Sequence, residues 1–490
     1  MRLIGRAAKG ALDLAKDAVD PDRMVQLSMS GLIEAARTRH ETDPAPPWRP
    51  GQPLELLLAG YVGTRNTGAD VRVEEMIRQF RHVFGDEHLA LSVCTIDPAL
   101  TRGYFRTARQ LHIPQIFHKF LYDTVRTHHG VIACEGSMFK SKFANALSTM
   151  MVGALGLAAA EDKIAVGYGG EAGSMDESLR RLVEKHCDKA LVIARNEESR
   201  AILDRLGVPT APGTDTAWTF EPAPRERAER LLERAGWDGA QPIVAFCPIH
   251  PFWWPVKPEP LKAAVHSVTG GWADAHYKSV YFHKHGPDVD RALDRYLRSM
   301  AGALKDFLRA RPGWFPILVG MEQLDRGAVE RLDEELGGGL PRFVSDEVEM
   351  YEMVALLRRA ALVVSSRYHA LVCSMPGLVP SVGVTMDERI KNLMDDRGQP
   401  ELALTVDDEH LDEHLLEAML RATDEADAVK DGIGRSVVSN LERMGRMGQI
   451  LERHVRGFHP DFPFPARPDD PFAYLPPLGP TTAPLVASYR

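Results

Sequence analysis

The sequence predicts an α/β protein with two parallel β-sheets, and three observations lead to this fold class. Short apolar runs alternate with amphipathic stretches through residues 54–194. After a charged helical stretch at 225–235, the same alternation returns in residues 243–384. The runs have the length of buried strands rather than of buried helices. Strands that alternate with helices form parallel sheets with crossover helices, so two Rossmann-like domains that face a cleft are expected.

The apolar runs themselves are the expected strands. Those of the first domain are 54–59, 89–94, 131–133, 163–166 and 190–194. Those of the second domain are 243–247, 279–282, 315–319, 361–364 and 381–384. Aliphatic residues fill nearly every position of these runs, which is typical of parallel strands buried on both faces.

Proline-rich and charged segments mark the expected domain boundaries. Residues 1–50 read as a helical leader with a proline-rich joint, because apolar residues recur at helical spacing before a run of prolines. The first Rossmann-like domain then covers 51–222 and the second covers 223–425. A C-terminal helix is expected at 426–458. The proline-dense tail, 459–490, is expected to be extended or disordered.

Composition excludes several classes of protein. The chain has 490 residues, of which 44% are hydrophobic and 26% charged, as in ordinary globular proteins. Its formal net charge of -9 argues against a nucleic-acid-binding protein, whose footprint is usually basic. The five cysteines have no zinc-finger spacing and are interpreted as reduced thiols of a cytoplasmic protein. The H-x-x-E-H pattern at 410–414 lies in an acidic helical stretch and is interpreted as a solvated helix face, so no metal site is predicted.

No transmembrane segment is expected. The longest apolar run, 150–160, is shorter than the roughly 20 residues that a membrane-spanning helix needs. The leader at 1–20 combines apolar and basic positions, so it can pack on the protein or lie on an anionic membrane surface. The expected location is the cytoplasm, and peripheral contact with the inner membrane surface stays open.

A glycine-rich turn follows the first expected strand. Gly63 and Gly68 would allow close approach of a ligand, and Asn66 and Asp70 can contact it through their side chains. The spacing is neither G-x-G-x-x-G nor that of a Walker P-loop, which disfavours a nicotinamide dinucleotide. The alternative is a turn that serves tight packing alone.

Ser366, Arg367 and His369 follow the strand expected at 361–364, where open α/β sheets bind ligands. The guanidinium of Arg367 can hold a carboxylate or a phosphate, and His369 can move a proton near neutral pH. This pair suits a small acidic substrate. The alternative is an arginine in a structural ion pair beside a core histidine.

A loop rich in aromatic residues follows the first strand of the second domain. Trp253 and Trp254 suit stacking on a sugar face, while His250 and Lys257 can contact hydroxyl or phosphate groups. His283 and Lys284, after the run 279–282, are further candidates for the acceptor or for phosphate. The alternatives are aromatic rings buried against the sheet and solvated surface charges.

Taken in order, several of these segments resemble the polysaccharide pyruvyl transferase family. The segments that carry the resemblance are 60–63 with 66–68, 194–203 with 206–208, and 366–370 ahead of 377–380. The resemblance implies a fold like that of GT-B glycosyltransferases, phosphoenolpyruvate as donor, and a pyruvate ketal formed on a pair of sugar hydroxyls. It also implies that Arg367 holds the acidic groups of the donor and that His369 serves as an acid.

The same resemblance implies the partners. The acceptor would be a saccharide or a lipid-linked saccharide of exopolysaccharide and cell-envelope synthesis, and no tightly bound cofactor is expected. Two positions depart from the family pattern: Glu135 places negative charge where glycines are usual, and Ala69 is inserted before Asp70.

Two alternatives follow from these residues. A glycosyltransferase using a sugar nucleotide would need a carboxylate that grips a ribose, for which Glu322 and Asp325 are candidates. A binding protein that kept the fold without catalysis would be marked by Glu135 in the anion site. The sequence does not indicate the acceptor sugar, the positions modified or the oligomeric state.

Overall fold

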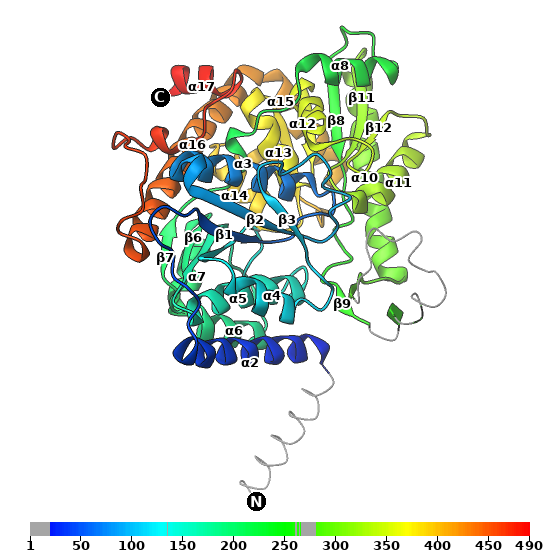
Figure 1. Cartoon of the computed structure of the whole chain (residues 1–490). Coiled ribbons are helices and arrows are strands. Elements are labelled where there is room, and N and C mark those ends of the chain that lie inside the picture. Colours follow the sequence, from blue (N-terminus) through cyan, green and yellow to red (C-terminus); the bar gives the residue numbers. More distant parts are fainter. Residues whose placement is uncertain (1–19, 135, 260–261, 264, 266–280) are drawn as a thin grey trace, which may run out of the picture.

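Two parallel β-sheets organise the protein, whose computed structural model describes residues 20–134, 136–259, 262–263, 265 and 281–490. Each sheet carries helices on both of its faces, and the two domains lie against each other (Figure 1). The predicted fold class is confirmed. The strands described for the first sheet come from residues 54–212 and those for the second from 243–405. The boundaries assigned at 222 and 425 stay predictions.

The first sheet contains every strand expected for it and two short edge strands besides. In sheet order its described strands are β3 (Arg109–His112), β2 (Leu89–Thr95), β1 (Leu54–Ala59), β4 (Gly130–Ala133), β5 (Ile164–Gly170), β6 (Leu191–Ala194) and β7 (Thr210–Pro212). Edge strand β3 is mostly polar, and β7 is only three residues long; both are partly exposed, so they lack the apolar run by which a central strand is recognised.

Successive residues of β1 enter two different cores. Leu56 and Leu58 belong to one core, and Leu57 and Ala59 belong to the other, as the two-residue period of a strand requires. Helix α3 (Thr67–Phe84) covers the first of these faces. The helices that supply the second core are α2 (Pro21–Thr42), α4 (His118–Arg126), α5 (Asn145–Ala160), α6 (Glu177–His186) and α7 (Glu197–Arg205).

Helix α2 is the described part of the expected leader, and residues 1–19 lie outside the described residues. It lies under α4, α5 and α6 (Figure 1). Gly153 and Gly156 of α5 make room for Met29 and Ile33, because a Cβ at either glycine would lie within 2.8 Å of those side chains. Helix α2 therefore packs on its own protein.

The second sheet contains four of the five strands expected for it. In sheet order its described strands are β12 (Arg342–Val344), β11 (Phe315–Gly320), β8 (Ile243–Cys247), β13 (Leu362–Ser365), β14 (Ser381–Thr385) and β15 (Ala403–Thr405). The prediction for 279–282 is wrong in its described part, because β10 (Tyr281–Phe282) pairs antiparallel with β9 (Lys257–Pro258) away from this sheet. Residues 279–280 lie outside the described residues.

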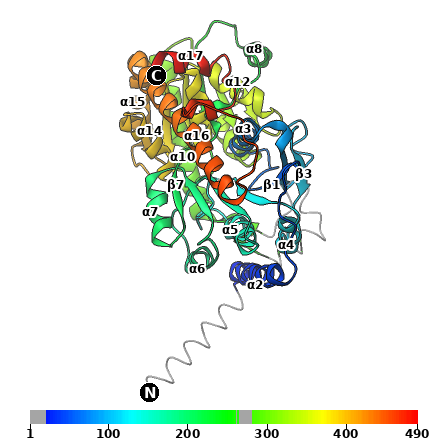
Figure 2. The ribbon, with the colours of Figure 1, turned by 60° about the vertical axis from the view of Figure 1, so that its left-hand side comes forward.

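Helices cover both faces of the second sheet. They are α8 (Arg225–Arg234), α10 (Pro287–Ala310), α11 (Arg326–Leu336), α12 (Met350–Arg359), α13 (Tyr368–Ser374), α14 (Glu388–Asp396) and α15 (Leu411–Asp424). Helix α16 (Ala426–Phe458) then returns to the first domain and runs beside β7 (Figure 2). No helix among the described residues is long and apolar enough to cross a membrane.

The C-terminal tail is ordered, which corrects the expectation of an extended or disordered arm. It contains the short 3-10 helix η6 (Pro471–Tyr474) and helix α17 (Thr482–Tyr489), and both pack on α16. The prolines that suggested an extended arm shape its connecting loops, while buried Phe462 and Leu475 fix it to the core.

Candidate active site

A cavity of about 1070 Å³ lies between the two domains, at the carboxyl ends of β1 and β13. This is where parallel sheets present ligand-binding residues. Many of the residues predicted from the sequence border the cavity, namely Asn66, Gly68, His250, Trp253, Trp254, His283, Ser366, Arg367 and His369. Four others do not border it, namely Gly63, Asp70, Lys257 and Lys284.

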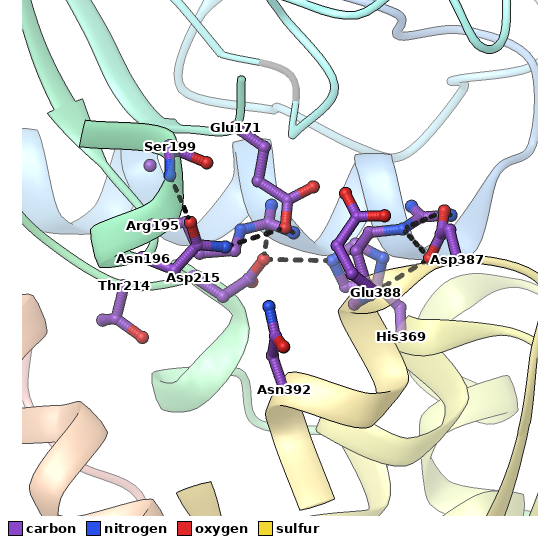
Figure 3. A network of polar contacts seen from close by, with 12 residues as sticks. Glu171, Arg195, Asn196, Ser199, Thr214, Asp215, His369, Asp387, Glu388 and Asn392 are labelled. Atoms are coloured by element: carbon purple, nitrogen blue, oxygen red, sulfur yellow. Dashed lines mark hydrogen bonds and ion pairs between the residues drawn. The ribbon is translucent and has the colours of Figure 1, made fainter. Parts of the chain in front are cut away.

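The imidazole of His369 contacts the buried carboxylate of Asp215. Its Nε2 lies 3.2 Å from Oδ2 of Asp215, which has no exposed surface. The same oxygen pairs with Arg195 Nη2 at 2.8 Å and with Arg72 Nε at 3.2 Å. Figure 3 shows Asp215 between Arg195 and His369. Three segments far apart in sequence therefore converge on one carboxylate.

The surroundings set the charge of this pair. Burial opposes ionisation of Asp215, but Arg195, Arg72 and His369 outweigh burial and hold the pKa of Asp215 well below its ordinary value. Burial lowers the pKa of His369, and the attraction of Asp215 offsets only part of this effect. Asp215 is therefore a carboxylate, and the resting imidazole of His369 is neutral at neutral pH.

A second group of ion pairs joins the two domains beside this carboxylate. Lys140 Nζ lies 3.1 Å from Glu171 of the first domain and 2.6 Å from Glu388 of the second. Arg389 pairs with Asp387 at 2.9 Å. Burial opposes ionisation of Asp387, but Arg389 and the nearby lysines dominate and lower its pKa to about 2.

Arg367 is committed to carboxylates, which corrects its predicted role as a free anion clamp. Its Nε lies 2.8 Å from Asp325 Oδ2, and its Nη2 lies 2.9 Å from Glu322 Oε2. The hydroxyl of Tyr61 and the side-chain amide of Asn66 also donate to Glu322, each at 3.1 Å. Burial raises the pKa of Asp325 to about 6 despite Arg367, so Asp325 is mainly ionised at neutral pH. Two acidic side chains therefore occupy the guanidinium of Arg367, and an anion gains little from it.

The glycine-rich turn after β1 positions His369 rather than enclosing a ligand by itself. Asn66 caps helix α3 by accepting from the backbone N–H of Ala69 at 3.2 Å. A Cβ at Gly68 would lie 2.4 Å from Cγ and Nδ1 of His369, so only glycine lets the ring sit there. Ala69, the inserted residue, thus supplies the N–H that the cap requires.

Gly63 and Asp70 have structural roles, which corrects their assignment to donor binding. Gly63 has a φ of +88° and faces the backbone of Asp97, so it serves the turn itself. The carboxyl of Asp70 is buried behind the turn, and burial raises its pKa to about 8. Neither residue borders the cavity.

Two histidine rings already stack on Trp253, which was predicted to stack on a sugar. His250 lies against the indole at 4.2 Å with an interplanar angle of 3°, and His283 stacks on it at 4.1 Å and 21°. Burial lowers the pKa of both histidines to about 4, so they are neutral ring partners rather than phosphate-binding cations. Trp254 meets Phe143 edge to face and forms part of the same wall. Lys257 and Lys284, the other predicted contacts, do not border the cavity.

A smaller cavity of about 200 Å³ adjoins the larger one. Tyr368 and Arg389 border both cavities and so form the wall between them. Arg195, whose guanidinium lies 5.3 Å from the centre of the Tyr368 ring, borders the smaller one. Two cations thus flank the residue that precedes His369.

This arrangement can be compared with known proteins. Residues 162–388 match the model of the polysaccharide pyruvyl transferase family. The resemblance read from the sequence motifs is confirmed over this segment, which is just under half of the chain and includes Arg195, Asp215 and His369. Members of the polysaccharide pyruvyl transferase family are transferases, so the prediction of a transferase is confirmed at the level of the family. No curated protein matches the chain.

Solved structures show the fold alone. A candidate UDP-N-acetylglucosamine 2-epimerase from Listeria monocytogenes is 11% identical with a TM-score of 0.53, over 85% of this chain and 99% of that one. The UDP-GlcNAc 2-epimerase from Neisseria meningitidis, bound to UDP-GlcNAc, is 11% identical with a TM-score of 0.50, over 82% and 100%. These similarities confirm the predicted GT-B-like arrangement.

Sequence reasoning missed three residues of the site, of which Arg195 and Asp215 lie within the segment that matches the polysaccharide pyruvyl transferase family. Arg195 directly follows β6 and stood in a motif quoted for the family, so its place after a strand was an available signal. Asp215 follows the short edge strand β7, which carries no apolar run. Arg72 lies inside a helix, where its burial has no signature in sequence.

Two open questions raised by the sequence have different outcomes. Glu322 and Asp325, the proposed ribose-binding carboxylates of a glycosyltransferase, are both bound by Arg367. Glu135, the proposed sign of lost catalysis, lies outside the described residues. In the 410–414 pattern, Nδ1 of His414 donates a hydrogen bond to Oδ2 of Asp408 at 2.8 Å.

Proposed function

We propose that this protein transfers a pyruvyl group from phosphoenolpyruvate to a pair of saccharide hydroxyls, forming a ketal. The observation that carries the proposal is His369, which borders the cavity between the domains and rests on Asp215 inside the segment that matches the family. Such a residue can exchange protons with a bound substrate.

The overall transfer balances without a redox step. The first hydroxyl oxygen bonds to C2 of phosphoenolpyruvate while C3 takes up a proton and becomes a methyl group. The second hydroxyl oxygen then bonds to the same carbon as the C2–O bond breaks and phosphate departs. One of the two hydroxyl protons is balanced by the proton gained at C3, and the other leaves with phosphate. The reaction needs no tightly bound cofactor, and phosphoenolpyruvate is a co-substrate.

His369 begins this sequence as a base. Its neutral imidazole takes the proton of the attacking hydroxyl, and the imidazolium so formed can return it as an acid. The expectation from sequence was an acid alone, but burial keeps the resting ring neutral. His369 alone can therefore both accept a proton from the acceptor hydroxyl and donate it again.

The anionic groups of the donor are assigned to Arg389 rather than to Arg367. Asp387 occupies Nε and Nη2 of Arg389, while Nη1 has no hydrogen-bond partner in the described part of the chain. Arg389 also borders both cavities next to Tyr368. A carboxylate or phosphate bound to Arg389 would lie beside Tyr368, the residue that precedes the catalytic His369.

The acceptor is assigned to the remainder of the larger cavity. Its volume of about 1070 Å³ is at the upper end of ordinary ligand pockets and far exceeds what a three-carbon donor occupies. Its walls combine aromatic rings with polar groups, which suits a saccharide of more than one ring.

The test is acceptor-dependent release of phosphate. The protein is incubated with phosphoenolpyruvate and a panel of glycans, while phosphate and the mass of each glycan are followed. We expect both phosphate and a glycan mass increased by one pyruvyl ketal. His369→Asn should reduce the rate about 10²–10⁴-fold, whereas the exposed matched control His410→Asn should not change it. Phosphate release in the absence of any glycan, or none with all of them, would contradict the proposal.

A further inference from the structure

The contact between Asp215 and His369 assigns separate tasks to the two imidazole nitrogens. We propose that Asp215 is a positioning residue that holds His369 in the Nε2–H tautomer, so that Nδ1 is the atom that exchanges protons with the substrate. This inference rests on the proposed function only where it concerns the substrate. The tautomer itself is a property of the free protein.

The tautomer follows from the hydrogen-bonding capacity of Asp215. Oδ1 accepts from the backbone N–H of Ala217 at 2.9 Å. Oδ2 faces two guanidiniums, those of Arg195 and Arg72. A carboxylate so surrounded is ionised and can only accept, so the hydrogen of its contact with His369 must be on Nε2.

The opposite side of the ring is open to the cavity. Nδ1 has no hydrogen-bond partner in the part of the chain that the structure describes, and both His369 and Gly68 border the cavity. Gly68 lies against Cγ and Nδ1, where any side chain would displace the ring. Tyr368 meets the ring edge to face at 5.1 Å and adds no polar partner. The lone pair of Nδ1 is thus left to a substrate hydroxyl.

The charged groups around His369 allow its imidazole to gain and lose a proton during the reaction. Arg72 is fixed by the carbonyl oxygens of Cys134 and Gly169, each at 3.1 Å, and Arg195 lies 3.8 Å from Glu171. Burial, together with these two guanidiniums, disfavours a second proton on the ring at rest, while Asp215 directly opposite Nε2 stabilises that proton once a substrate supplies it.

Nitrogen NMR of the whole protein with labelled histidine tests the tautomer without any substrate. His369→Asn identifies the resonances of His369 by their disappearance. We expect a protonated Nε2 and a bare Nδ1 in the unaltered protein. In Asp215→Asn the side-chain amide can donate to Nε2, so the Nδ1–H form should appear. A protonated Nδ1 in the unaltered protein, or no change in Asp215→Asn, would overturn the inference while leaving the proposed function standing.

Kinetics then test the positioning role. Asp215→Asn should lower kcat about 10²–10⁴-fold with KM for phosphoenolpyruvate changed less than about threefold, because the binding groups stay in place while His369 changes its tautomer. The exposed control Asp306→Asn, which borders neither cavity, should leave both constants unchanged. Unchanged kcat in folded Asp215→Asn would refute the positioning role. If that variant fails to fold, the NMR result on the unaltered protein still decides.

Discussion

At the scale of single residues, the neighbours of Arg367 decide what it can do. The sequence placed Arg367 correctly after a strand and at a ligand-binding edge, and the structure keeps it at the cavity. Its guanidinium is nevertheless occupied by Asp325 and Glu322, which lie more than 40 residues earlier in the chain. The alternative of a structural ion pair, left open by the sequence, is therefore the one that the structure supports.

Replacing Arg367 by methionine separates these two roles. Removal of the guanidinium leaves two carboxylates facing each other in a largely buried site, so the free energy of unfolding should fall by about 2–4 kcal/mol. The additional change Asp325→Asn removes one of the charges and should restore part of that loss. Denaturant unfolding measures both. If Arg367→Met instead kept its stability and raised KM for phosphoenolpyruvate tenfold or more, Arg367 would be a donor clamp.

At the scale of elements, helix α16 fixes the tail through glycines on its surface. The carbonyl of Pro471 lies against Gly445, Tyr474 packs on Gly448, and the ring of Tyr489 lies on Gly434. From the first domain, Arg78 donates to the carbonyl of Pro477 at 3.1 Å. The tail thus joins a helix of the second half of the chain to the first domain.

Gly445→Ala should loosen this tail. A Cβ at position 445 would lie 2.0 Å from the carbonyl oxygen of Pro471, and backbone atoms cannot yield as a flexible side chain can. We expect a loss of about 1–3 kcal/mol in the free energy of unfolding and faster proteolysis within residues 459–490. Gly457→Ala is the matched control, because it lies on the same helix with nothing within 4 Å. It should be neutral or slightly stabilising. Equal proteolysis of the two variants would show that the tail is not held at Gly445.

At the scale of the whole molecule, the sequence predicted the strands of the core but not the polar network around Asp215. Central strands such as β1 and β8 have the bounds expected from their apolar runs, because burial on both faces leaves a continuous signal. Edge strands β3 and β7 have no such signal. Asn66, Gly68 and His369 were predicted because each follows a strand, and their place at one cavity follows from the topology.

The missing part of the site depends on long-range pairing. Asp215 becomes important only because Arg72, Arg195 and His369 converge on it from three segments. A sequence shows which residues carry charge, but it does not show which charges neutralise each other. For that reason Arg367, the predicted clamp, forms structural ion pairs, whereas Asp215, which the sequence analysis overlooked, contacts the catalytic histidine.

Buried carboxyl groups also set how the stability of the whole molecule depends on pH. Burial raises the pKa of Asp70 to about 8, with Arg65 and the amide of Gly63 offsetting only part, and it raises that of Asp325 to about 6. Between their unfolded pKa near 4 and these folded values, the folded protein binds protons that the unfolded chain releases. Stability should therefore fall as the pH rises from about 5 to about 8. Asp387, with a pKa lowered to about 2, contributes stability above its unfolded pKa that is lost below about pH 4.

Asp70→Asn isolates the alkaline part of this profile. The amide has the shape of the carboxyl but no charge to bury, so the variant should be more stable than the unaltered protein by about 1–3 kcal/mol at pH 8 and nearly equal to it at pH 5. Denaturant unfolding at several pH values gives both curves, and Asp188→Asn, in an exposed loop, should reproduce the unaltered one. A flat profile for the unaltered protein between pH 6 and 8 would mean that Asp70 is ionised in the fold, and the turn after β1 would then have to hold that charge through Arg65.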